Sequence, residues 1–253
     1  MTATLAITMA GFGSRFANAG YTAPKYRIEA LGRPLFDWSM LALEGFRQAG
    51  WTFDFAVRAQ ENAEDFIRAR CRALNIPLGR LLSLPAPTDG QATTALLLAE
   101  HAPADAPFAV FNIDTFVRPG AMTPAAIPPC DGWIPCFPGA GEGWSFVRLD
   151  DTGVAVELRE KKRISDHATV GFYWFSSAKL YRDAYRRFFD GGGEEKGERY
   201  IAPMYNQLIA DGCKLRILEL ALDEVGQLGT PAQVEDFIRN PPASARAVAA
   251  RAS

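Results

Sequence analysis

The 253-residue sequence has few of the residues that most often carry out covalent or zinc-dependent chemistry. It contains only two histidines and four cysteines, and the histidines do not stand at ligand spacing from the cysteines. No Cys-x-x-Cys pair occurs among the cysteines, which are Cys71, Cys130, Cys136 and Cys213. A zinc site is therefore not expected, and reduced, buried thiols are the simplest interpretation.

Long apolar runs and long basic runs are also missing. No stretch approaches the roughly 18 apolar residues of a membrane span, and no basic N-terminal region precedes a long apolar one. Lysine and arginine are dispersed, and the formal net charge is -2. We expect neither a membrane nor a nucleic acid as partner, and a cytoplasmic location.

The composition is that of a folded chain, with 48% hydrophobic and 22% charged residues. This length suits one large domain, which we predict over residues 1–240 with halves at 1–120 and 121–240. The Pro- and Ala-rich residues 241–253 are predicted to be a flexible tail.

The first half alternates strand and helix patterns, which is typical of a parallel sheet covered by helices. We predict strands over 4–9, 53–57, 81–84 and 108–113, with helices over 34–50, 63–74 and 91–100. The second half reads as a hairpin over 144–158, strands at 170–175 and 215–220, and helices over 177–189 and 202–210. Thr230 and Pro231 open a last helix. The predicted fold is α/β: a three-layer, Rossmann-like mixed sheet.

A glycine loop with two spaced cations follows the first strand. Gly11 and Gly13 let the backbone approach an anion closely, and Arg15 and Lys25 supply positive charge. A dinucleotide fingerprint would have glycine where Phe16 stands, and a P-loop would close on Gly-Lys-Ser/Thr. Glycines also serve any tight strand-to-helix turn, so neighbouring motifs must decide the function.

Three further segments are candidates for chemistry. Asp114 ends a strand, where a carboxylate suits Mg²⁺ or simply caps a turn. The loop containing Asp89, Gly90 and Gln91 can lie beneath a base or form an ordinary helix N-cap. The charged cluster 159–163 is either a solvated face or a binding edge, and Gly171 interrupts a strand that follows it.

Together these segments resemble the sugar-phosphate nucleotidyltransferases over about residues 4–238. The resemblance rests on Met9–Phe16, Pro24-Lys25, Gly32–Leu35, Gly90–Ala92, Asp114, Glu160-Lys161, Thr169–Tyr173 and Gly229–Pro231, in that order. Residues 20–26 and 198–206 resemble the bacterial capsular or surface-polysaccharide branch. The implied fold is that of the nucleotidyltransferases and type-A glycosyltransferases.

The resemblance implies a role for each motif. Residues 1–120 would bind the nucleotide and residues 121–240 the acceptor, with Mg²⁺ as cofactor. Arg15, Lys25 and Asp114 would be catalytic. The nucleotide would be bound by Ala10, Gly11, Gly13, Ser14, Asp89, Gly90 and Gln91, and the acceptor by Glu160, Lys161, Gly171 and Glu198. The family's second metal-binding aspartate is replaced by Gln227, so Asp223 is expected to join Asp114 on the metal, with Glu198 as an alternative.

The implied reaction transfers an NMP from an NTP to a phosphorylated small molecule, most commonly a sugar 1-phosphate, and releases pyrophosphate. Three alternatives stay open: a cytidylyltransferase for a non-sugar phosphate, a glycosyltransferase that consumes a nucleotide sugar, and a nucleotide-sensing module without catalysis. These motifs do not determine the base or the acceptor. We expect exposed aromatic side chains, which are compatible with a homo-oligomer.

Overall fold

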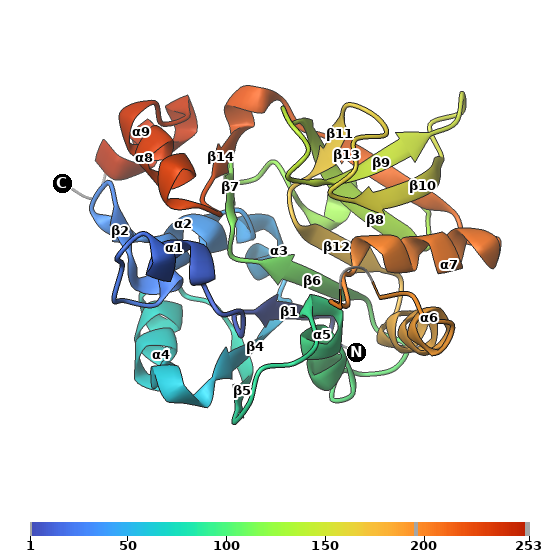
Figure 1. The fold of residues 1–253 in the computed structure, drawn as a ribbon, viewed down its shortest axis with the longest axis horizontal. Coiled ribbons are helices and arrows are strands. Elements are labelled where there is room, and N and C mark those ends of the chain that lie inside the picture. Colours follow the sequence, from blue (N-terminus) through green and yellow to red (C-terminus); the bar gives the residue numbers. More distant parts are fainter. Residues whose placement is uncertain (1, 195–196, 251–253) are drawn as a thin grey trace.

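The computed structural model describes residues 2–194 and 197–250. Its described residues form one ten-stranded sheet with two small two-stranded sheets beside it (Figure 1). Across the large sheet the strands are β10 (Ala155–Glu160), β9 (Ser145–Leu149), β11 (His167–Thr169), β8 (Gly132–Pro138), β12 (Phe172–Phe175), β6 (Phe108–Asn112), β1 (Thr4–Thr8), β4 (Thr52–Arg58) and β5 (Leu78–Leu84), and β13 (Leu215–Glu219) pairs with β8.

The first half of the chain builds the parallel part of this sheet. β1 lies between β4 and β6 and is parallel to both, and β5 is parallel to β4. β12 joins this part to the second half by pairing antiparallel with β6 and β8. The parallel first half and mixed second half predicted from the sequence are therefore confirmed.

Helices cover both faces of the sheet, which makes three layers. Leu5 and Ile7 of β1 belong to one buried cluster and Ala6 to the other, because successive strand residues point to opposite faces. One face packs against α2 (Leu35–Leu41), α3 (Glu44–Gln48) and α4 (Glu64–Ala73). The other packs against α5 (Gln91–Ala99), α6 (Ala178–Asp190) and α7 (Tyr205–Ala210).

A third, smaller core joins the C-terminal elements to the first half. It unites Phe16, Trp38 and Phe116 with Phe237 of a C-terminal helix. Its residues come from α1 (Ser14–Asn18), β2 (Glu29–Ala30), α2, β7 (Thr115–Val117), α8 (Pro231–Arg239) and α9 (Ala243–Ala250). Beside it, β3 (Arg33–Pro34) pairs with β2, and β14 (Val225–Gln227) pairs with β7. Short 3-10 turns lie at η1 (Lys25–Arg27), η2 (Ala59–Glu61), η3 (Pro124–Ala126), η4 (Ala202–Met204) and η5 (Leu222–Glu224). The strands β7 and β14 pair with each other and lie close to the loops after β1 and β6.

Several elements differ from the prediction, and the short strands β2, β3, β7, β11 and β14 were not predicted. The single helix expected over 34–50 is divided into α2 and α3. β8 was missed because its Pro135 and Pro138 argue against a strand, yet it pairs with three neighbours. The expected flexible tail forms α9 over Ala243–Ala250, since an Ala-rich segment has high helix propensity and the small Ala245 side chain packs fully buried. The remainder of that tail, 251–253, lies outside the described residues.

No helix within the described ranges is long and apolar enough to cross a membrane.

Candidate active site

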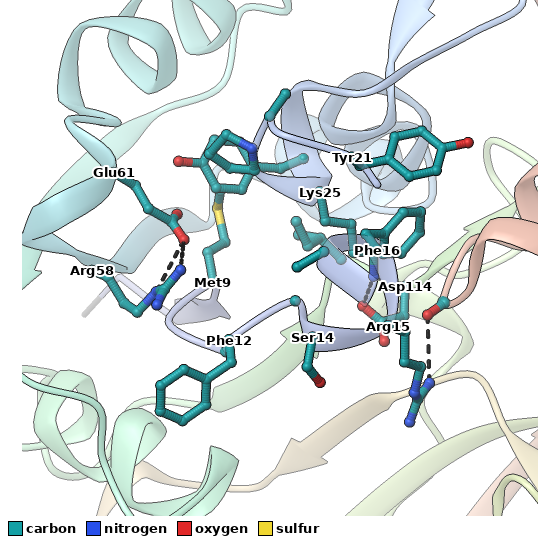
Figure 2. Close-up of a pocket in the computed structure, with 18 of the residues that line it drawn as sticks. Met9, Phe12, Ser14, Arg15, Phe16, Tyr21, Lys25, Arg58, Glu61 and Asp114 are labelled. Carbon is teal, nitrogen blue, oxygen red and sulfur yellow. Dashed lines mark hydrogen bonds and ion pairs between the residues drawn. The ribbon is translucent and has the colours of Figure 1, made fainter. Parts of the chain in front are cut away.

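A cavity of about 590 Å³ opens at the carboxyl edge of the parallel strands (Figure 2). Its wall is formed by the loop after β1, by residues 21–26, by the end of β4, and by Asp114 and Gly229. Open α/β sheets bind ligands in the crevice outside the carboxyl ends of their strands. The predicted phosphate loop thus lines a real cavity at the expected place.

Arg15, Lys25 and Asp114 converge on this cavity although they are far apart in sequence. The ammonium of Lys25 donates to Oδ1 of Asp114, and Nη1 of Arg15 donates to the carbonyl of Gly229 at 3.4 Å. The side chain of Lys25 is 13% exposed and that of Asp114 is 40% exposed. An incoming anion would therefore meet two cations and one accessible carboxylate.

Burial lowers the pKa of Lys25 below its ordinary value. The negative charge and hydrogen bond of Asp114 act in the opposite direction, and the positive charge of Arg15 adds to the lowering. A bound polyanion would favour the charged ammonium. The site thus holds a lysine whose charged form an anionic ligand would stabilise.

The loop after β1 turns through a glycine that no other residue replaces easily. Gly13 has φ 61°, in the left-handed region, and it caps α1. Gly11 and Ser14 line the cavity, whereas Ala10 is buried beneath it at 6% exposure. On the opposite side of the cavity the exposed ring of Phe12 lies 5.5 Å from the Arg58 guanidinium carbon.

A second cavity, of about 640 Å³, adjoins the first and contains the predicted acceptor residues. Glu160, Lys161, Gly171 and Glu198 all line it. Arg15, Asp114 and Gly229 line both cavities and form the wall that they share. Two ligands in the two cavities would therefore meet at Asp114.

Hydroxyl side chains to which the sequence analysis gave no role hold Glu160. The hydroxyl of Ser145 donates to Oε2 of Glu160, and Tyr173 donates to Ser145 at 3.3 Å. The Tyr173 hydroxyl also shares a hydrogen bond with Thr169 at 3.0 Å. Hydroxyls on strands are too common in sequences to single out these residues. They give the Glu160 carboxylate a fixed orientation.

Lys161 has an unusual backbone for a lysine, with φ 49°. Its ammonium donates to the hydroxyl of Tyr200 at 2.7 Å, and the backbone N–H donates to the carbonyl of Trp144 at 2.9 Å. Left-handed backbone at a non-glycine residue is often found at functional sites. The ammonium is thereby held beside Glu160 at the cavity wall.

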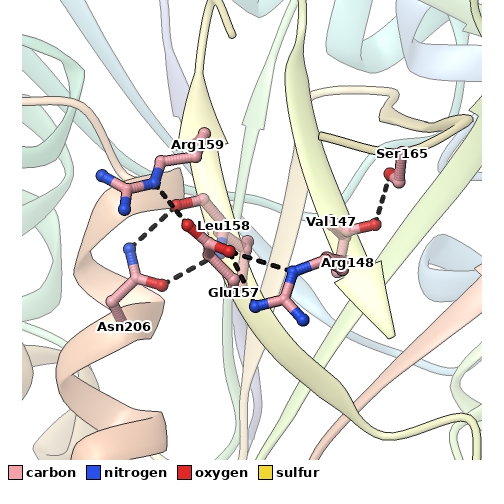
Figure 3. A network of polar contacts seen from close by, with 7 residues as sticks. All are labelled: Val147, Arg148, Glu157, Leu158, Arg159, Ser165 and Asn206. Atoms are coloured by element: carbon pink, nitrogen blue, oxygen red, sulfur yellow. Dashed lines mark hydrogen bonds and ion pairs between the residues drawn. The ribbon is translucent and has the colours of Figure 1, made fainter. Parts of the chain in front are cut away.

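The charged cluster predicted at 159–163 is anchored at the edge strand β10 (Figure 3). Arg148 donates to Oε2 of Glu157 at 2.8 and 3.0 Å, and Arg159 donates to Oε1 at 2.7 Å. Asn206 of α7 donates to the Leu158 carbonyl and accepts from its N–H, both at 2.9 Å. The two Asn206 bonds satisfy backbone groups on the open edge of the sheet, two residues before Glu160.

Of the three residues expected at the base, only Gln91 lines the acceptor cavity, and it donates to Thr8 Oγ1 at 3.1 Å. The described residues Asp89 and Gly90 line neither cavity. The carboxylate of Asp89 pairs with Arg199 at 3.1 Å, and a Cβ on Gly90 would lie 2.5 Å from the Arg199 backbone. Arg199 therefore connects the segment containing Glu198 to the start of α5. A sequence pattern could not reveal this contact.

A neighbouring side chain of the protein requires glycine at position 171. It has φ 77°, and a Cβ there would overlap the side-chain amide of Asn112. Gly171 also lines the acceptor cavity, together with Asn112. Packing against Asn112 thus explains why a glycine stands here, and the acceptor role of Gly171 stays a prediction.

The expected second metal ligand lies elsewhere. Asp223 is exposed in η5, beyond the end of β14 that pairs with Val117, whereas Asp114 precedes the other end of β7. Three to four residues of extended strand separate these ends by about 10 to 13 Å. That part of the prediction is wrong. No group of three or more histidine, cysteine or carboxylate side chains in residues 2–194 and 197–250 forms a metal cluster. Asp114 is the carboxylate at the shared wall.

Burial makes the cysteines poor candidates for nucleophiles. Burial raises the pKa of the Cys71 thiol to about 12 and that of Cys130 to about 11, and it also raises the pKa values of Cys136 and Cys213. A thiol with a raised pKa is a poor nucleophile at neutral pH.

No protein-family model matches this chain, and no curated protein sequence matches it. Solved structures do. The nucleoside-diphosphate-sugar pyrophosphorylase from Vibrio cholerae RC9 is 35% identical with a TM-score of 0.83, over 93% of this chain and 100% of that one.

Two more distant structures share the fold. The inositol-1-phosphate CTP transferase from T. maritima has a TM-score of 0.72 at 14% identity, over 96% of this chain and 98% of that chain. A putative glucose-1-phosphate thymidylyltransferase from Bacillus anthracis, in complex with a sucrose, has a TM-score of 0.75 at 14% identity, over 96% of both chains. The 35% identity over 93% of this chain and 100% of the Vibrio cholerae protein shows that the chain belongs to the sugar-phosphate nucleotidyltransferase superfamily.

Proposed function

We propose that this protein transfers the NMP group of an NTP to a sugar 1-phosphate and releases pyrophosphate. The observation that supports this most directly is the wall shared by the two cavities, formed by Arg15, Asp114 and Gly229. An NTP bound along the β1 loop and an acceptor bound beside Glu160 and Lys161 would meet at that wall.

The reaction needs no covalent help from the protein. A phosphate oxygen of the acceptor forms a bond to the α-phosphorus, and the bond from that phosphorus to the bridging oxygen of pyrophosphate breaks. The leaving oxygen keeps the electron pair. Both reactants are polyanions, so holding them in line and neutralising charge supplies most of the rate enhancement. Arg15, Lys25 and Lys161 would supply the positive charge.

Mg²⁺ fits the donors at the shared wall. Oδ1 of Asp114 contacts Lys25, and Oδ2 is the oxygen nearer to Gly229. Mg²⁺ accepts one carboxylate together with phosphate oxygens and water, so Asp114 would hold it with the help of the NTP. When bound, the ion supplies charge neutralisation on the phosphates. The chain's own cations position the triphosphate against the acceptor.

The acceptor side favours a hydroxyl-rich molecule. Glu160 is an acceptor for sugar hydroxyls, and Lys161 next to it is a cation for the phosphate. A sugar 1-phosphate has both groups. The capsular-type segments 20–26 and 198–206 support a role in bacterial surface-polysaccharide synthesis, which would draw on the cytoplasmic NTP pool.

A pyrophosphate-release assay tests this proposal. The purified protein is mixed with Mg²⁺, each of the four common NTPs and a panel of sugar 1-phosphates, with phosphocholine as a non-sugar acceptor. We expect release with at least one sugar 1-phosphate and none with Asp114→Asn under the same conditions. Release only with phosphocholine would refute the sugar acceptor, and binding of NTP with no release for any pair would refute the enzyme function. NDP formation from nucleotide sugars instead would indicate a glycosyltransferase.

A further inference from the structure

Gln227 occupies the position where a second metal-binding carboxylate was expected. It is the last residue of β14 and pairs with Thr115, and it lines the acceptor cavity. The next residue, Leu228, donates its backbone N–H to the carbonyl of Asp114 at 2.7 Å. Gln227 is therefore held in the immediate neighbourhood of Asp114 by paired backbone.

A chain of hydrogen bonds fixes the polarity of the Gln227 amide, that is, which of its two ends is the oxygen and which is the NH₂ group. The backbone N–H of Gly229 can only donate, so the Gln233 atom that it meets at 3.1 Å must be the oxygen. The other end of the Gln233 amide is then the NH₂ group, which donates to Gln227 at 2.9 Å. The Gln227 atom that receives this bond must in turn be its oxygen.

The start of α8 keeps Gln233 in place. The Gln233 backbone N–H donates to Oγ1 of Thr230, the N-cap of the helix, at 3.2 Å. A glutamine at this position commonly reaches back to the chain before the helix. The oxygen of Gln227 is thus committed to Gln233, and among the described residues no group accepts from the Gln227 NH₂.

From this geometry we propose that Gln227 offers a hydrogen-bond donor, and not a metal ligand, to a phosphoryl oxygen bound beside Asp114, with Gln233 as the positioning residue. The assignment of that anion as a substrate phosphate rests on the proposed function. The neutral donor removes one negative charge from the place where two polyanions meet. Among the described residues, Asp114 is then the one carboxylate that lines both cavities.

Two simple binding probes measure, without any turnover, whether Gln227 presents a donor or an acceptor to the cavity. Mn²⁺ alone is titrated by electron paramagnetic resonance of the free ion, and inorganic phosphate alone is titrated by ³¹P line broadening. Gln227→Met keeps the side-chain length and removes the donor. We expect it to weaken phosphate binding about tenfold, as for loss of one hydrogen bond to a charged group, and to leave Mn²⁺ binding unchanged.

Gln233→Glu provides the sharper test. One carboxylate oxygen still accepts from Gly229, and the other now faces Gln227 as an acceptor. Gln227 must then turn its NH₂ toward residue 233 and its oxygen toward the cavity. We expect weaker phosphate binding and tighter Mn²⁺ binding. The double variant Gln233→Glu with Gln227→Met is the control for added charge, and the gain in Mn²⁺ binding should disappear in it.

Several results would overturn the inference. Unchanged phosphate affinity in Gln227→Met would remove the donor role, and loss of Mn²⁺ binding in that variant would show a metal ligand. A gain in Mn²⁺ binding that persists in the double variant would reflect charge alone. If Gln233→Glu does not fold, Gln227→Met still decides the matter. Failure of the pyrophosphate assay with these binding results intact would refute the proposed function and leave the polarity of Gln227 standing.

Discussion

Replacing Lys25 with methionine removes one positive charge from the first cavity, beside Asp114, and keeps most of the side-chain volume. Two unit charges about 4 Å apart interact by about 4 kcal/mol at an effective dielectric constant of about 20. Lys25 is only 13% exposed, so solvent replaces little of this interaction. About 4 kcal/mol lost in the transition state corresponds to roughly a thousandfold lower kcat. We expect a fall of between about a hundredfold and a thousandfold.

The same substitution should hardly change stability. Loss of the contact with Asp114 is offset because an ammonium no longer has to be desolvated, and the 40% exposed carboxylate can be hydrated. We expect the free energy of unfolding to change by less than about 1 kcal/mol. Thermal unfolding of both proteins, followed by circular dichroism, checks that Lys25→Met is folded.

Pyrophosphate release at saturating NTP and acceptor gives kcat, and Lys25→Arg, which keeps a cation, is the matched control. The arginine variant should retain more activity than the methionine variant. A folded Lys25→Met protein with kcat within threefold of the wild type would refute the assignment of Lys25 to charge neutralisation.

Three further predictions follow from the same geometry. Because burial lowers the pKa of Lys25, kcat/KM should decline with rising pH before the ordinary lysine range, and Lys25→Arg should shift that decline to higher pH; identical profiles would contradict this. Arg70→Ala should cost about 3 kcal/mol in urea unfolding, because it leaves the fully buried Asp37 carboxylate without its partner, and Asp37→Asn in the same background should recover part of the loss; a cost below about 1 kcal/mol would contradict it. Gly171→Ala should cost about 1 to 3 kcal/mol, because a Cβ there overlaps the Asn112 amide at a left-handed φ, and the KM for the acceptor should rise more than that for the NTP; equal KM changes would argue against its place in the acceptor cavity.

The sequence was most informative where chemistry and backbone requirements coincide in a short segment. The loop from Gly11 to Arg15 needs glycines for its turn and a cation for its ligand, so both requirements are visible within one short segment of sequence. Asp114 could be placed because a buried strand has an obvious end, and strand ends in parallel sheets share an edge. The parallel half of the sheet was predicted from the alternation of strand and helix patterns.

Assignments that depend on partners far along the chain were less secure. Asp89 looked like a base-contacting residue, but Arg199, more than a hundred positions later, holds its carboxylate. Asp223 was offered as a metal ligand by proximity in sequence, and strand pairing carries it to the wrong end of β14. The prolines of β8 concealed a central strand, because local propensity says nothing about the neighbours that complete its hydrogen bonds.

The amino-acid sequence by itself determined the alternation of elements, the phosphate loop and the kinds of side chain available at the carboxyl edge, because these depend on periodicity and local backbone preference. Only the tertiary structure decided which of those side chains meet: that Arg15 and Asp114 share a wall between two cavities, that Ser145 orients Glu160, and that Gln233 sets the polarity of Gln227. Such contacts join residues that the chain separates by up to about a hundred positions, and their geometry follows from strand register and packing, which no short stretch of sequence contains.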